Sequence, residues 1–390
     1  MTNSVSRWNA IKTAVRPDFR ALFGQPRTWC MQAGRMQAGR MQAGRIQAGP
    51  TQVAGIRSWG SRACVIQLGL AACLGLSGGV ARAANDVVIF TDRDLGTAIG
   101  AAVAPMKSHI RAVETDVRAG DAACTTLPGN RVRFALLARN PSQAEIDVCA
   151  GGVRADVIAV PVGFQAMALA TPANGVVFSV SSADLFRALG ANAAGARPTT
   201  WDQLGAGYPS APIAVLAAPP GSITQQVFDA RMEAACFGTA PAAGMPFDRA
   251  GRLAYCGALR KDASVQPRPA GAGAVAAWAK TAGAGAVALV SVSELAALDG
   301  VVVPLLIDNV TPSAVNIAAG RYGAARPVTL MIVLPREADA ARRDLARKAA
   351  FDLMAESMIG PGGALGGGGV IALQPADRLE ARTKAVAFIE

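Results

Sequence analysis

The chain has 390 residues, of which 38 are Lys or Arg and 27 are Asp or Glu, and its pI is about 9.8. The excess positive charge lies at one end. Residues 1–83 hold eleven basic residues and one acidic residue, which leaves 27 basic and 26 acidic residues in the rest of the chain. A nucleic-acid-binding protein carries its basic residues on the folded part, so this distribution excludes a nucleic-acid partner.

Residues 57–83 have the features of an export signal. Arg57 and Arg62 precede the apolar stretch 63–80, and an Ala-Arg-Ala sequence that ends at Ala83 has the form that signal peptidase accepts. We therefore expect cleavage near Ala83 and a location in the periplasm.

Two alternatives to a cleaved signal stay open at this point. The apolar stretch is close to the length of a membrane anchor, and residues 70–73 have the form of a lipoprotein box that would leave a lipidated Cys73. In front of the signal, residues 31–50 repeat a five-residue unit that is too short to build a core. The repeat is either a functional extension or the product of an over-extended start codon, so we treat residues 1–83 as a leader outside the fold.

Four cysteines follow the leader, and an even number suits disulfide bonds in an oxidising compartment. They allow three connectivities, of which Cys124 with Cys149 and Cys236 with Cys256 closes two local loops of similar size. A metal site is disfavoured because no two of these cysteines have the close spacing of a zinc knuckle. We expect no metal and no cofactor.

Short apolar segments alternate with amphipathic segments along the rest of the chain, which predicts an α/β fold with largely parallel sheets. The expected strands are 87–90, 132–137, 157–162, 166–170, 213–216, 286–290, 301–306 and 328–334. The expected helices are 92–110, one that starts near Asn140, 182–189, 222–235, 273–280, 293–298 and 338–358. No segment after Val80 is apolar enough to span a membrane.

Two strand-to-helix junctions have the composition of an anion site. Gly221, Ser222 and Thr224 lie between the strand 213–216 and the next helix, where backbone N–H groups, hydroxyls and the helix dipole converge. Thr91 and Asp92 occupy the equivalent place after the first strand, where either can cap the helix. Each junction alone is also explained by ordinary helix capping.

The segment 213–228 resembles the strand, Gly-Ser-Gly-Thr turn and helix of the periplasmic phosphate-binding proteins, a branch of the type 2 periplasmic binding proteins. The resemblance continues, in the same order along the chain, at four further segments: 182–186, 200–204, 283–290 and 321–327. It implies a monomer of two α/β lobes joined by two crossing strands, with a ligand in the cleft and an ABC permease as partner. We expect lobe 1 at 84–170 and 286–390, lobe 2 at 171–285, and the crossings near 170–171 and 286–290.

The resemblance also implies a set of ligand-binding residues, which are Thr91, Asp92, Arg139, Gly221, Ser222 and Thr224. Three features of the family are missing: the second glycine of the turn, which Ile223 replaces, the arginine often found before the turn, where Ala217 and Ala218 lie, and the Ser-rich turn. The loop that contains Cys124, Thr125 and Thr126 lies where the family has a Ser-rich turn. The expected ligand is phosphate or a similar small oxyanion, and because of these departures another oxyanion or a small organic acid would suit the same groups too.

An enzyme is not expected, because the chain has one histidine, His109, and no recognisable pair of catalytic carboxylates. The sequence thus predicts a solute-binding protein that serves an ABC transporter. The alternative is an envelope protein-interaction or assembly factor on a binding-protein scaffold that has lost its ligand.

Overall fold

The computed structural model describes residues 87–106, 110–115, 119–125, 131–152, 154–239, 244–269 and 273–390. The leader with its repeat and Cys73, together with His109 and Thr126, lies outside the described residues, so the expectations for them stay predictions. Within the described part of the chain, no helix has both the length and the apolar character that crossing a bilayer needs.

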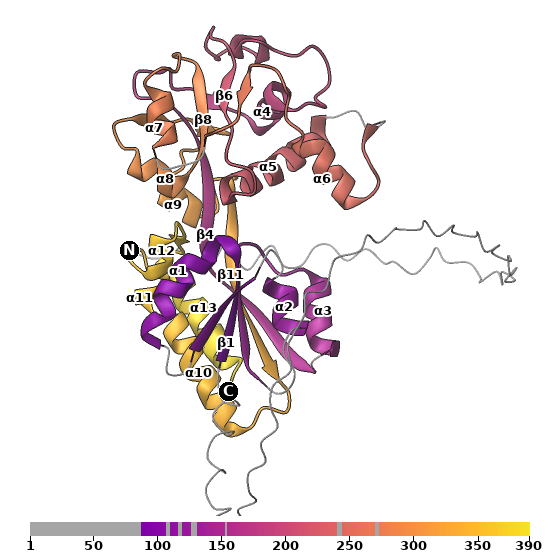
Figure 1. The fold of residues 1–390 in the computed structure, drawn as a ribbon, viewed down its shortest axis with the longest axis vertical. Coiled ribbons are helices and arrows are strands. Elements are labelled where there is room, and N and C mark those ends of the chain that lie inside the picture. The colour runs from indigo at the N-terminus through magenta and orange to yellow at the C-terminus, as the bar shows by residue number, and fades with distance from the viewer. Residues whose placement is uncertain are drawn as a thin grey trace, which may run out of the picture. The chain divides into compact units, whose positions relative to one another are not determined.

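The architecture is mixed α/β, and its main sheet has the strand order β2-β1-β3-β11-β4-β8-β6-β7, with β9 and β12 paired to β4 (Figure 1). The strands are β1 Val87–Asp92, β2 Ile110–Thr115, β3 Arg133–Leu137, β4 Ala155–Pro172, β6 Ala214–Leu216, β7 Val265–Gln266, β8 Ala286–Ser291, β9 Val302–Pro304, β11 Ala325–Pro335 and β12 Ile371–Ala372, while β5 Ser179–Val180 pairs with β10 Leu306–Ile307. The helices are α1 Arg93–Val103, α2 Ala119–Thr125, α3 Gln143–Gly152, α4 Ser182–Leu189, α5 Ile223–Thr239, α6 Arg249–Gly257, α7 Ala274–Ala279, α8 Val292–Ala297, α9 Ala314–Ala318, α10 Ala340–Leu353, α11 Glu356–Ile359, α12 Ala364–Gly367 and α13 Pro375–Ala387.

Strands β1, β3 and β11 are buried on both faces of the sheet, which explains why they read as continuous apolar runs. Val87 and Ile89 of β1 pack in one hydrophobic cluster, and Val88 and Phe90 pack in a second cluster on the opposite face. β1 pairs in parallel with β2 and β3, and β11 lies antiparallel between β3 and β4. A strand covered on both faces has no solvent-facing side, so its sequence lacks the usual alternation of apolar and polar residues.

A separate pair of clusters forms around the other half of the sheet. Met167, Leu169, Val287 and Leu289 pack on one face, and Ala288 packs on the other. β6 pairs in parallel with β7 and β8, while β4 and β8 are antiparallel. Strand β8, which we expected to cross between the lobes, therefore packs within this second core.

The strands that reach both cores are β4 and β11 (Figure 1). Val160 and Val162 of β4 pack in the first core and Met167 in the second, while β11 contributes Val328 to the first and Ala325 to the edge of the second. We propose on this packing that the chain crosses between lobes near 165 in β4 and near 325 in β11, which would assign 286–324 to lobe 2.

Several boundaries differ from those predicted. The expected helix 92–110 ends at Val103, followed by a 3-10 turn at Ala104–Met106 and by β2, which the sequence did not indicate. Pro105 explains this, because its ring removes a backbone donor and cannot continue a helix interior. The long C-terminal helix likewise ends at Leu353 instead of 358.

Two disulfides fix local helix pairs and have the predicted connectivity. Cys124 of α2 is bonded to Cys149 of α3, and Cys236 of α5 to Cys256 of α6. In each case the bond joins two helices that also pack on one another. Nearest neighbours along the chain are paired because the partners lie on consecutive helices.

Trp201 anchors the second core and supports a stability prediction. Its side chain is fully buried, its Nε1 donates a hydrogen bond to the carbonyl oxygen of Gly285 at 2.9 Å, and its ring lies 5.2 Å from that of Phe178. We expect Trp201→Phe to lower the free energy of unfolding by about 2 kcal/mol, because it leaves a buried carbonyl unpaired and a small cavity. Urea unfolding followed by circular dichroism measures the change.

Trp278→Phe is the matched control for this experiment. Trp278 is half-buried and its indole nitrogen makes no hydrogen bond to the described part of the chain. The control should lose less than about 1 kcal/mol. Equal losses in the two variants would show that the Trp201 hydrogen bond contributes nothing specific.

Candidate ligand-binding site

The turn between β6 and α5 presents the start of a long helix to the surrounding residues. Gly221 has a φ of +76°, a left-handed conformation that glycine adopts without steric cost. Ser222 caps the helix, since its Oγ accepts the N–H of Gln225 at 3.2 Å. The N–H groups of Ile223 and Thr224 have no intrahelical acceptor by the geometry of a first turn. Positive potential therefore collects at this point.

A cavity of about 260 Å³ lies at the start of α5. It brings together residues from five separate parts of the chain: strand β4, the first turn of α5, the segment after β7, the end of β8 with the start of α8, and the glycines after α12. Its lining residues are Gln165, Ala166, Ser222, Ile223, Thr224, Arg268, Ser291, Ser293, Glu294, Gly368 and Gly369. Two of the predicted ligand residues, Ser222 and Thr224, are thus in the cavity wall.

Arg268 is the positive charge of this cavity, and no local sequence pattern indicated it. Its Nη1 donates to both carboxylate oxygens of Glu294, at 3.0 and 2.9 Å, and more weakly to the carbonyl oxygen of Leu289. Its Nη2 and Nε make no hydrogen bond to any described residue. The Arg268 side chain is 11% exposed. Two donor atoms of a mostly buried guanidinium therefore remain for a ligand.

The place of Arg268 follows from strand pairing. β7 runs parallel to β6 with Gln266 opposite Leu216, and the N–H of Ala217 donates to the carbonyl oxygen of Gln266 at 2.9 Å. Arg268 follows Gln266 by two residues, as Ala218 follows Leu216. The arginine that the family often has before the turn is absent from this chain. Arg268, which follows the neighbouring strand β7, lies at the same edge of the sheet instead.

Gln165 adds a buried donor that lacks a partner. The residue is 1% exposed, and its Oε1 accepts a hydrogen bond from Nη2 of Arg326 at 3.1 Å. A guanidinium can only donate, so the amide oxygen must face Arg326 and the amide nitrogen must face away. That nitrogen is buried without an acceptor. A buried unsatisfied donor costs about 1–3 kcal/mol, which an acceptor atom of a ligand would recover.

Thr91, Asp92 and Arg139 form a second group at the carboxyl ends of β1 and β3. Thr91 is fully buried, and Oδ2 of Asp92 accepts the N–H of Ala138 at 2.7 Å, which ties the end of β1 to the residue before Arg139. The three predicted residues therefore lie together. Among the described residues they are not in the wall of the 260 Å³ cavity.

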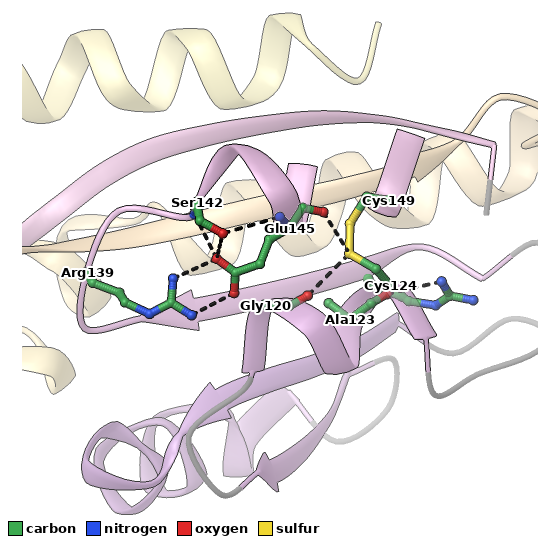
Figure 2. The surroundings of a disulfide bond; sticks show 8 residues. Gly120, Ala123, Cys124, Arg139, Ser142, Glu145 and Cys149 are labelled. Atoms are coloured by element: carbon green, nitrogen blue, oxygen red, sulfur yellow. Dashed lines mark hydrogen bonds and ion pairs between the residues drawn. A yellow bond between two sulfur atoms is a disulfide. The ribbon is translucent and has the colours of Figure 1, made fainter. Parts of the chain in front are cut away.

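Arg139 is held by a buried carboxylate (Figure 2). Its Nη1 and Nη2 donate to the two carboxylate oxygens of Glu145 at 2.7 and 2.6 Å, and the backbone N–H and hydroxyl of Ser142 donate to the same carboxylate. Burial alone would raise the pKa of Glu145, but the hydrogen bonds from Arg139 and Ser142 outweigh it and lower the pKa to about 2.

Helix α2 and a disulfide bond pack closely against the Arg139–Glu145 ion pair. A Cβ at Gly120 of α2 would lie 2.3 Å from Oε1 of Glu145, so α2 can pack here only because residue 120 has no side chain. The Cys124–Cys149 disulfide lies beside it, with Sγ of Cys124 3.8 Å from the carbonyl oxygen of Glu145 (Figure 2). Arg139 thus has a structural role whether or not it touches a ligand.

Comparison with known proteins places this arrangement in a family. The family model described as PBP superfamily domain matches residues 79–349. The chain belongs to the PBP superfamily. No curated protein matches the chain.

Solved structures give the same fold for this member of the PBP superfamily. A possible phosphate binding protein from Planctomyces limnophilus DSM 3776 is 15% identical, with a TM-score of 0.54 over 78% of this chain and 99% of that one. PstS from Borrelia burgdorferi is 11% identical, with a TM-score of 0.53 over 74% of this chain and 99% of that one. Identities this low establish the fold only, which is that of the type 2 periplasmic binding proteins, as the resemblance predicted.

The site of this PBP superfamily member is built from hydroxyls, one amide and one ion pair. In the part of the chain that the structure describes, no cluster of His, Cys, Asp or Glu could hold a metal ion. What the arrangement can do chemically is to surround a small polar group with hydrogen-bond donors.

Proposed function

We propose that this chain is a periplasmic solute-binding protein that holds a small oxyanion in the cavity at the start of α5 and presents it to an ABC permease. The observation that carries the proposal is the set of unused donors there: Nη2 and Nε of Arg268 and Nε2 of Gln165. Binding-protein membership and similarity to phosphate-binding folds support it. Capture requires no catalytic step, since donors alone hold an anion.

The predicted residues take different parts in this proposal. Gly221 shapes the turn, and Ser222 and Thr224 offer hydroxyls beside the N–H groups of α5. Thr91, Asp92 and Arg139 would meet the ligand from the other lobe if the lobes close by a hinge, the usual motion of such proteins. Arg139 would then act with Glu145 attached.

Export to the periplasm is part of the same proposal. The two disulfides support an oxidising compartment, because such bonds are rare in reducing ones. Mass spectrometry of the exported protein would give its N-terminus. We expect the N-terminus at residue 84. A lipidated Cys73 or an uncleaved leader would show that this prediction is wrong.

Calorimetric titration of the exported protein with inorganic phosphate tests the binding proposal. We expect saturable heat, and Thr224→Val should weaken binding about five- to tenfold through the loss of one hydroxyl, since a hydrogen bond contributes about 1 kcal/mol. Thr239→Val is the control, because Thr239 lies at the other end of the same helix and bonds the carbonyl oxygen of Ala235. Absence of heat with any oxyanion at millimolar concentration would favour the assembly role instead.

A further inference from the structure

The polar cavity adjoins a second cavity of about 430 Å³. Both have Ser293 and Gly369 in their walls, so these two residues lie between the cavities. The second cavity lies between α8 and α9 on one side and the segment from Pro361 to Arg378 on the other. Its size is within the range of small-molecule sites, which is about 300–1,000 Å³.

The chemistry of the second cavity is the opposite of the first. Its wall is mostly apolar, and the apolar side chains that line it are Val292, Ala296, Ala314, Val315, Ala318, Pro361, Val370, Ile371, Ala372, Leu373 and Pro375. Among the described lining residues the one charge is that of Arg378, which is held by Glu356 at 2.9 Å and by the carbonyl oxygen of Leu373 at 2.6 Å. Hydrocarbon, not a second charged group, suits this space.

Only small residues, Ser293 and Gly369, lie in the wall that the two cavities share. Gly369 has a φ of +82°, and a Cβ there would lie 2.8 Å from Oγ of Ser293. Any other residue at position 369 would therefore press on Ser293 and strain the backbone. With glycine at this position, the wall between the polar and apolar cavities contains the small side chain of Ser293 and no side chain from residue 369.

We propose that the ligand is an organic oxyanion with a short aliphatic chain, an inference that rests on the proposed function and names its substrate class. The anionic head occupies the polar cavity, with donors from Arg268, Gln165 and the start of α5. The chain passes Ser293 and Gly369 and lies against Val292 and Val315 in the apolar cavity. Inorganic phosphate fills the first cavity alone and leaves the second in contact with water.

A series of alkylphosphonates tests this inference on the exported protein. Methyl-, butyl- and hexylphosphonate share the head group and differ in hydrocarbon, and inorganic phosphate, with a fourth oxygen in place of the alkyl group, is the reference without a chain. Burial of a methylene group contributes about 0.8 kcal/mol, so each added methylene should tighten Kd about fourfold until the cavity is full. Calorimetry gives Kd for each member of the series.

Two alanines on α8 provide matched variants. Ala296 lines the apolar cavity, while its neighbour Ala297 is also exposed to solvent and lines neither cavity. Ala296→Trp should abolish the dependence on chain length and leave the affinity for phosphate unchanged, whereas Ala297→Trp should leave both unchanged.

The outcomes separate the two proposals. If phosphate binds and longer chains bind no tighter, the organic ligand is refuted and the oxyanion site stands. If neither phosphate nor any phosphonate binds, the oxyanion site itself is refuted, and the substrate class with it. A chain-length effect that Ala297→Trp removes as fully as Ala296→Trp would also refute the apolar cavity as the place of the chain.

Discussion

Replacement of Arg268 by methionine should weaken oxyanion binding about 100-fold or more and leave the fold intact. Hydrogen bonds to a charged donor contribute about 1.5–3 kcal/mol each, and Nη2 and Nε are both available. Methionine keeps most of the side-chain volume, so the cavity wall should not collapse. Calorimetric titration gives the affinity, and urea unfolding gives the stability.

The stability cost of this change is expected to stay within about 1 kcal/mol, because the partner Glu294 is one-third exposed and can be solvated. Arg187→Met is the matched control, since Arg187 forms an exposed pair with Asp184 outside the cavity. If Arg268→Met binds as the parent protein does, Arg268 is no ligand residue and the proposed site fails.

Replacement of Arg139 by methionine should, unlike Arg268→Met, mainly affect stability. We expect it to lower the free energy of unfolding by about 3 kcal/mol. Its partner Glu145 is 6% exposed, and removal of one member of a buried ion pair leaves an uncompensated charge. Bonds from Ser142 to the same carboxylate remain and reduce the loss. Urea unfolding at neutral pH measures it.

The pH dependence of stability tests whether the charge of Glu145 causes the stability loss in Arg139→Met. The pKa of Glu145 is about 2 in the folded protein and lies near 4.3 in an unfolded chain, so the ionised group stabilises the fold above about pH 4.3. That contribution, roughly 3 kcal/mol, is lost as the pH falls toward 2. Arg139→Met removes the largest of the interactions that lower the pKa of Glu145, so the difference in stability from the parent protein should be largest near neutral pH and shrink in acid.

Arg336→Met is the control for this experiment, because Arg336 pairs with Asp156 where both side chains are more than half exposed. It should change stability by less than about 1 kcal/mol at any pH. A loss of ligand affinity in Arg139→Met without a loss of stability would instead make Arg139 a direct ligand residue.

Local patterns predicted the fold class and the disulfides well, and they failed where a distant segment decides the structure. β4 was expected as two strands that stop on either side of Gly163, yet it is one strand from Ala155 to Pro172. A Cβ at Gly163 would lie 2.4 Å from Cγ1 of Val370 and 2.7 Å from the carbonyl oxygen of Ile371. The glycine is required by the close approach of β12, which no local pattern reveals.

The candidate site shows the same limit. Ser222 and Thr224 could be predicted because a strand, a turn and a helix follow one another in sequence. Arg268 could not, because β7 has two residues and its pairing with β6 spans about fifty positions of the chain. In the sequence, Gln165 lies in the middle of an apolar strand and has no feature of a ligand residue. Only its hydrogen bond with Arg326 shows which end of the amide faces the cavity.

The orientation of Gln165 has an evolutionary consequence. Glutamate has nearly the same shape, would form an ion pair with Arg326 in place of the amide bond, and would turn an acceptor oxygen toward the ligand where Nε2 is now a donor. Glutamine and glutamate codons differ in one base. A single point mutation can therefore replace one donor of this cavity by an acceptor while the scaffold around it stays the same, so descendants of one such gene could diverge in the ligand they hold without any change of fold.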